Sequence, residues 1–137
     1  MTTPVGHLRG RVAVLALVAL LAIVVAGCGN ASTSGPAITK ADAGTAVSML
    51  KARTLIDVRT PAEYAAGHIA GARNIDVEGT DFASAISTLD KGAAYLVYCH
   101  SGRRSAMAAE QMAAAGFTDI VDGGAMADLV AAGAPTQ

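Results

Sequence analysis

The stretch Ala94-Tyr-Leu-Val-Tyr-Cys-His-Ser-Gly-Arg-Arg-Ser105 decides how this sequence folds. Its first five residues form an apolar run rich in aromatic and branched side chains, which is typical of a buried strand. The run leads directly into Cys99, and Gly102 marks a tight loop before a helix that we predict over residues 104–115. A strand, a tight loop and a helix in this order form the repeating unit of a parallel α/β sheet.

Strands and helices alternate along the rest of the sequence between residues 37 and 137. Short apolar runs predict four more strands, which begin at Ile38 or cover residues 54–58, 72–76 and 120–121. Thr39 and Asp42 are interpreted as the N-cap and capping-box partner of a helix that continues to Leu50. Further helices are expected over residues 62–66, where Pro61 stands at the start, over 82–89, and from Gly124 to Gly133. The sequence therefore predicts one α/β domain, with a mostly parallel five-stranded sheet flanked by helices on both faces.

Length and composition restrict the class of protein. With 137 residues the chain has room for one domain, and a hydrophobic content of 53% excludes an intrinsically disordered chain. Its 10 basic and 11 acidic residues give no reason to expect nucleic-acid binding. We find no metal-ligand spacing, so we expect neither a metal nor another cofactor, and nothing in the sequence favours an oligomer over a monomer.

The first 27 residues differ from the rest and indicate export. Two arginines precede an apolar run over residues 12–26, which at 15 residues is shorter than the roughly 18 that a membrane-spanning helix needs. The following Val25-Ala-Gly-Cys28 resembles the lipobox of bacterial lipoproteins, which implies cleavage before Cys28 and lipidation of its sulfur. An ordinary cleaved signal remains the alternative. Residues 28–36 are predicted to be a flexible tether that holds a domain of residues 37–137 at the membrane, outside the cytoplasm.

Cys99 is the residue most suited to chemistry. It ends a strand and precedes a helix, which is where open α/β sheets bind ligands. Loop amides, the positive end of the helix dipole and the guanidinium groups of Arg103 and Arg104 would all favour its thiolate. If Cys28 carries lipid, Cys99 has no cysteine left to pair with. The alternative is that Cys99 is an unreactive, small buried residue.

Three motifs in this order resemble those of the rhodanese family, the single-domain sulfurtransferases. The first is Asp57-Val-Arg59 with Glu63-Tyr64, and the second is Gly67-His-Ile-Ala-Gly-Ala72. The third, Cys99-His-Ser-Gly-Arg-Arg104 followed by Ser105, resembles the active-site loop of the family. The match covers most of residues 38–135. Two positions depart from the family pattern: residues 125–129 lack an aromatic side chain, and the third loop position is Ser101.

The resemblance implies that Cys99 takes sulfane sulfur from a donor such as thiosulfate, becomes a persulfide and passes the sulfur to cyanide or a thiol. The partners would then be a small sulfur donor and a thiophilic acceptor, together with the membrane through the lipid anchor, and no nucleic acid is expected. The sulfur would lie among the amides of the anion-binding loop, which comprises His100, Ser101, Gly102, Arg103, Arg104 and Ser105. Asp57 and Arg59 are expected to support the site as a buried pair.

Three other functions stay open at this point. The domain could be a sulfur carrier that serves one partner protein, or an inert structural domain. It could also be a phosphatase or arsenate reductase of the same fold, although such loops place five residues between the cysteine and the arginine. Here that arginine position is Ser105, and Arg104 comes one residue earlier, which favours sulfur transfer.

Overall fold

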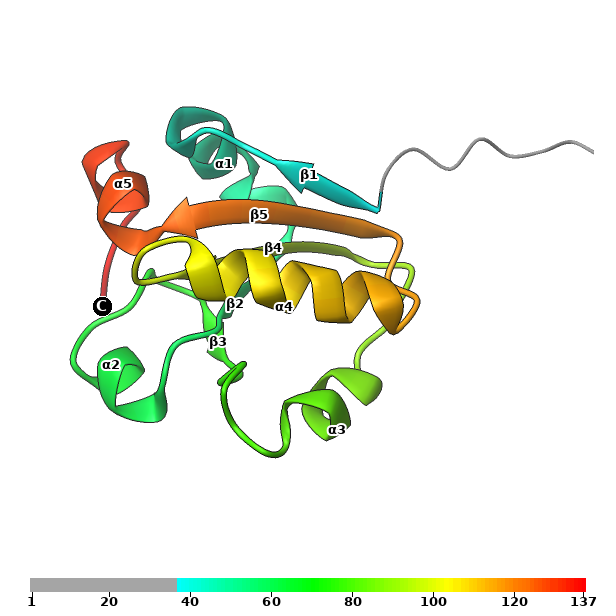
Figure 1. Cartoon of the computed structure of the whole chain (residues 1–137). Coiled ribbons are helices and arrows are strands. Elements are labelled where there is room, and N and C mark those ends of the chain that lie inside the picture. The colour runs from blue at the N-terminus through cyan, green and yellow to red at the C-terminus, as the bar shows by residue number, and fades with distance from the viewer. Residues whose placement is uncertain (1–36) are drawn as a thin grey trace, which may run out of the picture. The chain divides into compact units, whose positions relative to one another are not determined.

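The computed structural model describes residues 37–137 (Figure 1). The predicted signal segment, the tether and Cys28 lie outside the described residues. No helix within residues 37–137 is long and apolar enough to cross a membrane. In chain order the elements are β1 (Ile38–Lys40), α1 (Ala43–Met49), the 3₁₀ helix η1 (Leu50–Ala52), β2 (Thr54–Asp57), α2 (Pro61–Ala65), β3 (Arg73–Asn74), α3 (Phe82–Ser87), β4 (Ala94–Cys99), α4 (Arg103–Ala114), β5 (Asp119–Ala125) and α5 (Met126–Ala131).

The strands form one five-stranded sheet in the order β1-β5-β4-β2-β3. Each neighbouring pair is parallel, so the predicted fold class is confirmed. β4 lies in the centre of the sheet between β2 and β5. Because the strands are parallel, their carboxyl ends meet at one edge, and the loops that follow them gather there.

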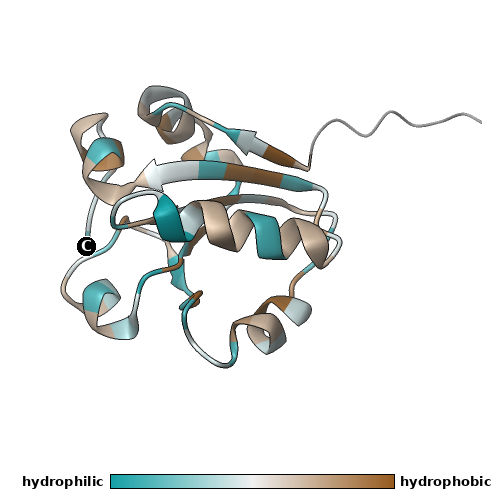
Figure 2. Cartoon of the chain, viewed as in Figure 1, coloured by the Kyte–Doolittle hydropathy of each residue, from teal (hydrophilic) through white to brown (hydrophobic). Residues whose placement is uncertain are grey.

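Helices cover both faces of the sheet, as the alternation of side chains along β4 requires. Tyr95, Val97 and Cys99 point into one core cluster, against α3 and α4. Leu96 and Tyr98 point into the other, with α1 and α5. Figure 1 shows α4 running along β4 and β5, and Figure 2 shows that polar residues interrupt the apolar residues of this helix. The central strands are buried on both faces, which explains why their sequences are continuous apolar runs.

Local signals set several helix ends as the sequence predicts. Pro61 stands in the first turn of α2 as predicted, and the structure adds a capping box between Thr60 and Glu63 that the sequence analysis did not identify. Gly116 follows α4 with φ of 97°, a left-handed conformation that glycine adopts without steric cost. Both signals depend on neighbours in sequence, and for that reason they could be recognised before the structure.

Three details of the prediction are wrong. The N-cap of α1 is Asp42, whose side chain accepts the amide of Thr45, whereas Thr39 pairs with Val121 inside β1. β3 has two residues instead of the five predicted over 72–76. β5 is longer than predicted and includes Gly123, where a Cβ atom would lie 2.8 Å from Leu96 Cδ2. The glycine permits close packing of β5 on β4 and does not end the strand.

Candidate active site

Cys99 is the last residue of the central strand β4, and α4 begins four residues later at Arg103. The residue is fully buried and its side chain belongs to the core cluster beneath α4. Two neighbouring parallel strands end beside it, so the cysteine lies at the edge of the sheet where α/β folds bind their ligands. The structure thus places Cys99 where the sequence predicted.

The sulfur of Cys99 accepts a hydrogen bond from the Gly102 amide, with the two atoms 3.0 Å apart. Gly102 is the residue before the first turn of α4 and has a φ of 91°, which turns the chain sharply enough for this contact. An amide at the amino end of a 12-residue helix carries partial positive charge. This contact therefore places a partially positive donor directly against the sulfur.

The other members of the loop have different environments. Ser105 is fully buried, and its hydroxyl donates to the Gly102 carbonyl at 3.0 Å, which holds the loop against the start of α4. His100 and Ser101 are exposed. Of these loop residues, Gly102 thus contacts the sulfur through its amide, and Ser105 fixes the loop through its hydroxyl.

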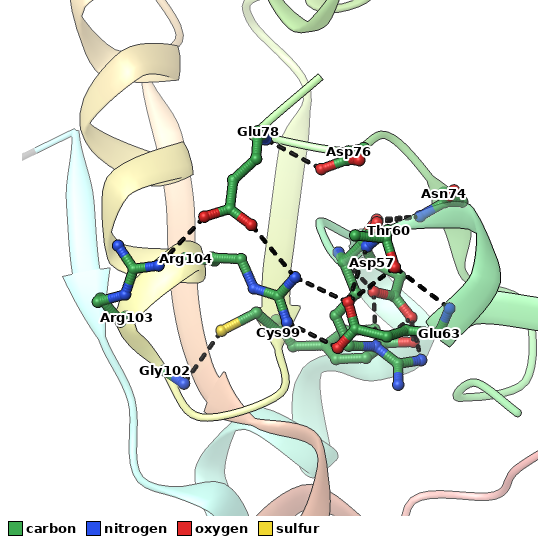
Figure 3. Close-up of polar contacts among 12 residues, drawn as sticks. Asp57, Thr60, Glu63, Asn74, Asp76, Glu78, Cys99, Gly102, Arg103 and Arg104 are labelled. Atoms are coloured by element: carbon green, nitrogen blue, oxygen red, sulfur yellow. Dashed lines mark hydrogen bonds and ion pairs between the residues drawn. The ribbon is translucent and has the colours of Figure 1, made fainter. Parts of the chain in front are cut away.

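Arg104 forms a two-pronged ion pair with a residue that the sequence analysis did not assign to the site. Its two terminal nitrogens lie 2.8 and 2.7 Å from the carboxylate oxygens of Glu63, and Glu78 lies 3.5 Å away (Figure 3). The guanidinium holds the pKa of Glu63 at about 2, well below its ordinary value, with help from the Thr60 amide. Glu63 in turn raises the pKa of Arg104.

Arg103 is exposed and pairs with the same Glu78 at 3.1 Å. Both arginines expected to attract an anionic donor are thus paired with carboxylates. Glu63 belonged to the first motif, but its partner lies 41 residues away in sequence. Glu78 follows a short strand and no local pattern singles it out. Helical or strand periodicity does not encode such long-range pairs, so sequence reasoning missed them.

Asp57 and Arg59 form a buried ion pair, as the sequence predicted for two supporting residues. Arg59 Nη2 lies 2.6 Å from Asp57 Oδ2 and also donates to the Gly67 carbonyl at 2.8 Å. The Tyr98 hydroxyl donates to Asp57 Oδ2 at 2.8 Å. Asp57 raises the pKa of Arg59 through these hydrogen bonds. The pair therefore connects β2, the Gly67 turn and the residue before Cys99, on the face opposite to the sulfur.

The cysteine loop thus combines the Cys99 sulfur with the ion pairs of Arg103 and Arg104. The Cys99 sulfur accepts a hydrogen bond from the amide at the start of α4, and Arg104 in the first turn of that helix carries the ion pair with Glu63. Within residues 37–137 no group of three His, Cys, Asp or Glu side chains is arranged to hold a metal ion. The chemistry that this part of the chain supports is nucleophilic attack by sulfur.

Comparison with known proteins gives consistent matches. A family model described as the rhodanese-like domain matches residues 40–127. Thiosulfate sulfurtransferase PspE of Escherichia coli is 35% identical over 74 residues, which cover 54% of this chain and 71% of that protein. Thiosulfate sulfurtransferase GlpE of Pseudomonas putida is 42% identical over 72 residues, or 51% of this chain and 64% of GlpE. The match thus spans less than two thirds of the length of the Pseudomonas relative.

Solved structures match over a larger share of the chain. The solution structure of the rhodanese-like domain of the Anabaena protein Alr3790 has a TM-score of 0.64 and 28% identity, covering 75% of this chain and 80% of that domain. A rhodanese from Escherichia coli, solved with anions, has a TM-score of 0.54 and 32% identity, covering 63% of this chain and 98% of its own.

Proposed function

The chain belongs to the rhodanese-like domain family, and from this premise we propose that it is a sulfurtransferase that carries sulfur as a persulfide on Cys99. Relatives named thiosulfate sulfurtransferases support sulfur transfer as the type of reaction. The observation that carries the proposal is the hydrogen bond of 3.0 Å from the Gly102 amide to the Cys99 sulfur, at the start of a long helix. This contact places a fixed donor on the sulfur that must carry negative charge during the reaction.

The reaction proceeds in two balanced steps. The Cys99 thiolate attacks the outer sulfur of thiosulfate, the sulfur–sulfur bond of the donor breaks, and its electron pair leaves with sulfite. Cys99 is then a persulfide anion. Cyanide or a thiolate attacks the terminal sulfur, takes it as thiocyanate or a new persulfide, and restores the Cys99 thiolate. No general base is required when the thiolate is already present.

The loop supplies electrostatic stabilisation and no proton transfer. Negative charge sits on the cysteine sulfur before the first step and on the outer sulfur after it. The Gly102 amide and the amino end of α4 are fixed by the fold, so they stabilise this charge without reorganisation. Asp57 and Arg59 act through structure, because they fix Tyr98, the residue before the cysteine.

Intact-protein mass spectrometry tests the proposal. The purified chain is incubated with thiosulfate, and we expect it to gain one sulfur atom and to lose it again when cyanide is added. The Cys99→Ser variant should keep its fold, as judged by circular dichroism, and gain no sulfur. A gain of sulfur in that variant would show that Cys99 is not the acceptor.

The full burial of Cys99 favours one second candidate, a sulfur carrier that serves a partner protein. A carrier would form the persulfide but would turn over poorly with small molecules, since these must reach a covered sulfur. Steady-state kinetics with thiosulfate and cyanide separate the two. Saturable turnover supports the enzyme, whereas persulfide formation without turnover supports the carrier.

We also propose that the protein is exported and lipid-anchored through Cys28, since Val25-Ala-Gly-Cys28 follows a 15-residue apolar run. The domain of residues 37–137 would then act at the membrane, outside the cytoplasm. Expression of the chain with radiolabelled palmitate tests this proposal. Label is expected in the wild type and absent from Cys28→Ala, and a wild type without label would contradict it.

A further inference from the structure

Glu78 is shared by the two arginines of the cysteine loop. Its Oε1 lies 3.1 Å from Arg103 Nη2, and its Oε2 lies 3.5 Å from Arg104 Nη1. Figure 3 shows the carboxylate between the two guanidinium groups. Glu78 lies in the segment between β3 and α3, far in sequence from the loop, so the fold brings a negative charge to the mouth of the site.

The charges of this cluster cancel before any donor arrives. Arg103 and Arg104 contribute two positive charges, and Glu63 and Glu78 contribute two negative ones. The thiolate of Cys99 adds a further negative charge. A dianion that approaches the sulfur must therefore compete with a carboxylate for each guanidinium group.

The two carboxylates are held with different strength. Glu63 makes two hydrogen bonds to Arg104 and also accepts the amide and the hydroxyl of Thr60. Glu78 is 45% exposed, its contact with Arg104 is longer, and its own amide donates to Asp76 in a surface turn. Glu78 is thus the carboxylate that a donor can displace, and Glu63 remains as part of the scaffold.

We propose that Glu78 is a specificity-determining residue, which acts through Arg103 and Arg104 to disfavour dianionic sulfur donors relative to donors with a single negative charge. The proposal rests on the sulfur-transfer function proposed above. It defines the preferred donor class as monoanionic sulfane sulfur, such as a thiosulfonate or a persulfide. Glu78 does not touch the reacting sulfur, so its role is to set the charge that the donor meets.

Two donors that differ by one charge make the proposal testable. Thiosulfate is a dianion and leaves as sulfite. Methanethiosulfonate is a monoanion, and attack of the Cys99 thiolate on its terminal sulfur breaks the sulfur–sulfur bond and releases methanesulfinate. Both reactions give the same Cys99 persulfide, so a difference between them reports on donor charge.

The experiment measures kcat/KM for both donors, with cyanide as acceptor, in the purified full chain in detergent. In Glu78→Gln we expect kcat/KM for thiosulfate to rise about three- to tenfold and that for methanethiosulfonate by less than about twofold. The gain should shrink as salt is added, because the charges are partly exposed. A purely structural role of Glu78 would change both donors alike and would not depend on salt in this way.

Asp81→Asn is the matched control. It removes one negative charge from the same exposed segment, and within residues 37–137 Asp81 forms no ion pair with either arginine. We expect it to leave the ratio of the two kcat/KM values within about twofold of the wild type. A ratio that moves as far in Asp81→Asn as in Glu78→Gln would reduce the effect to net charge and overturn the assignment.

The outcomes separate this inference from the function on which it rests. If neither donor adds a sulfur to Cys99 of the wild type by mass spectrometry, the proposed function fails. If both donors load Cys99 but Glu78→Gln changes them equally, or lowers the value for thiosulfate, the function stands and the role of Glu78 is wrong.

Discussion

The domain contains two arginine–carboxylate clusters that are alike in chemistry and opposite in setting. In the Asp57–Arg59 pair the side chains are 0% and 7% exposed, and the remaining contacts go to Tyr98 and Gly67 of the same scaffold. In the second cluster Arg104 is 14% exposed, whereas its partners Glu63 and Glu78 are 32% and 45% exposed. The first cluster lies on the face of the sheet opposite to the cysteine sulfur, and the second lies beside it.

The difference shows how burial assigns a role to an ion pair. A buried ion pair whose hydrogen bonds all lie within the fold cannot exchange a partner, because the charge left behind would stay buried without a counter-charge. A pair at the surface costs little to separate, since water replaces the lost partner. Arg59 is therefore a structural residue, whereas the setting of Arg104 is compatible with the exchange of Glu78 for an anionic donor that we propose above.

The largest expected effect is on stability, and it tests the assignment of the buried cluster. Asp57→Asn leaves the Arg59 charge buried without its counter-charge and should lower the free energy of unfolding by about 3–5 kcal/mol. Glu78→Gln, the matched change at the surface, should cost less than about 1 kcal/mol. Urea unfolding of both variants measures the two values. Equal losses would mean that burial does not separate the clusters.

The next effect extends the comparison to the backbone of the cysteine loop. Gly102→Ala places a Cβ on a residue with φ of 91°, which should cost about 1–2 kcal/mol of stability. It should also reduce sulfur transfer, since relaxing the strain moves the Gly102 amide away from the sulfur.

Gly116→Ala provides the control for this variant at the other end of α4. Its φ of 97° predicts a similar loss of stability, and Gly116 makes no contact with Cys99. We expect transfer to stay near the wild-type rate. If both variants lose transfer equally, the loss follows from stability and not from the amide contact.

The comparison also shows what could be predicted from sequence. The strand, the glycine turn and the helix around Cys99 are encoded by neighbouring residues, and so is the proximity of Asp57 to Arg59, two positions apart on one strand end. The sheet follows from the alternation of such units, because parallel strands require helical crossovers. These features could be predicted because each depends on local propensity or on spacing.

The features that were missed depend on contacts between distant segments. The pairing of Glu63 with Arg104 spans 41 residues, and Glu78 reaches the loop from the segment after β3. Gly123 resembled a loop residue in sequence, but the close approach of Leu96 makes it part of β5. Thr39 resembled a cap, but strand pairing with β5 holds it extended and leaves capping to Asp42. Tertiary contacts decided each of these cases.

A smaller effect is expected on the donor preference of the exposed cluster. Arg104→Ala leaves Glu63 without its guanidinium and Glu78 with Arg103 alone, so it should lower kcat/KM for thiosulfate roughly tenfold more than for methanethiosulfonate. Arg104→Lys keeps the charge and loses the two-pronged geometry, and it should recover part of the thiosulfate rate. Kinetics with both donors measure the ratio. An equal loss for both donors in Arg104→Ala would mean that the guanidinium does not act on donor charge.

The smallest effect is a pH dependence that belongs to the exposed cluster. Because Arg104 holds the pKa of Glu63 at about 2, the folded protein favours ionised Glu63 more than the unfolded chain does. This contribution to stability is complete above the ordinary value of 4.5 and is lost as pH falls from there towards 2. The Glu63→Gln variant lacks this contribution at every pH. Urea unfolding at a series of pH values should therefore show the difference in free energy of unfolding between the two proteins shrinking as pH falls from 4.5 towards 2.

The salt dependence of this stability difference tests whether it comes from an exposed ion pair. Added sodium chloride screens the attraction between Glu63 and Arg104, so it should narrow the gap between wild type and Glu63→Gln above pH 4.5 as well. If the difference in free energy of unfolding between wild type and Glu63→Gln depends on neither pH nor salt, Glu63 contributes through the capping box of α2, which an uncharged glutamine preserves in part. In that case the ion pair between Glu63 and Arg104 would add nothing measurable to stability, and Glu63 would not hold the Arg104 guanidinium against an anionic donor.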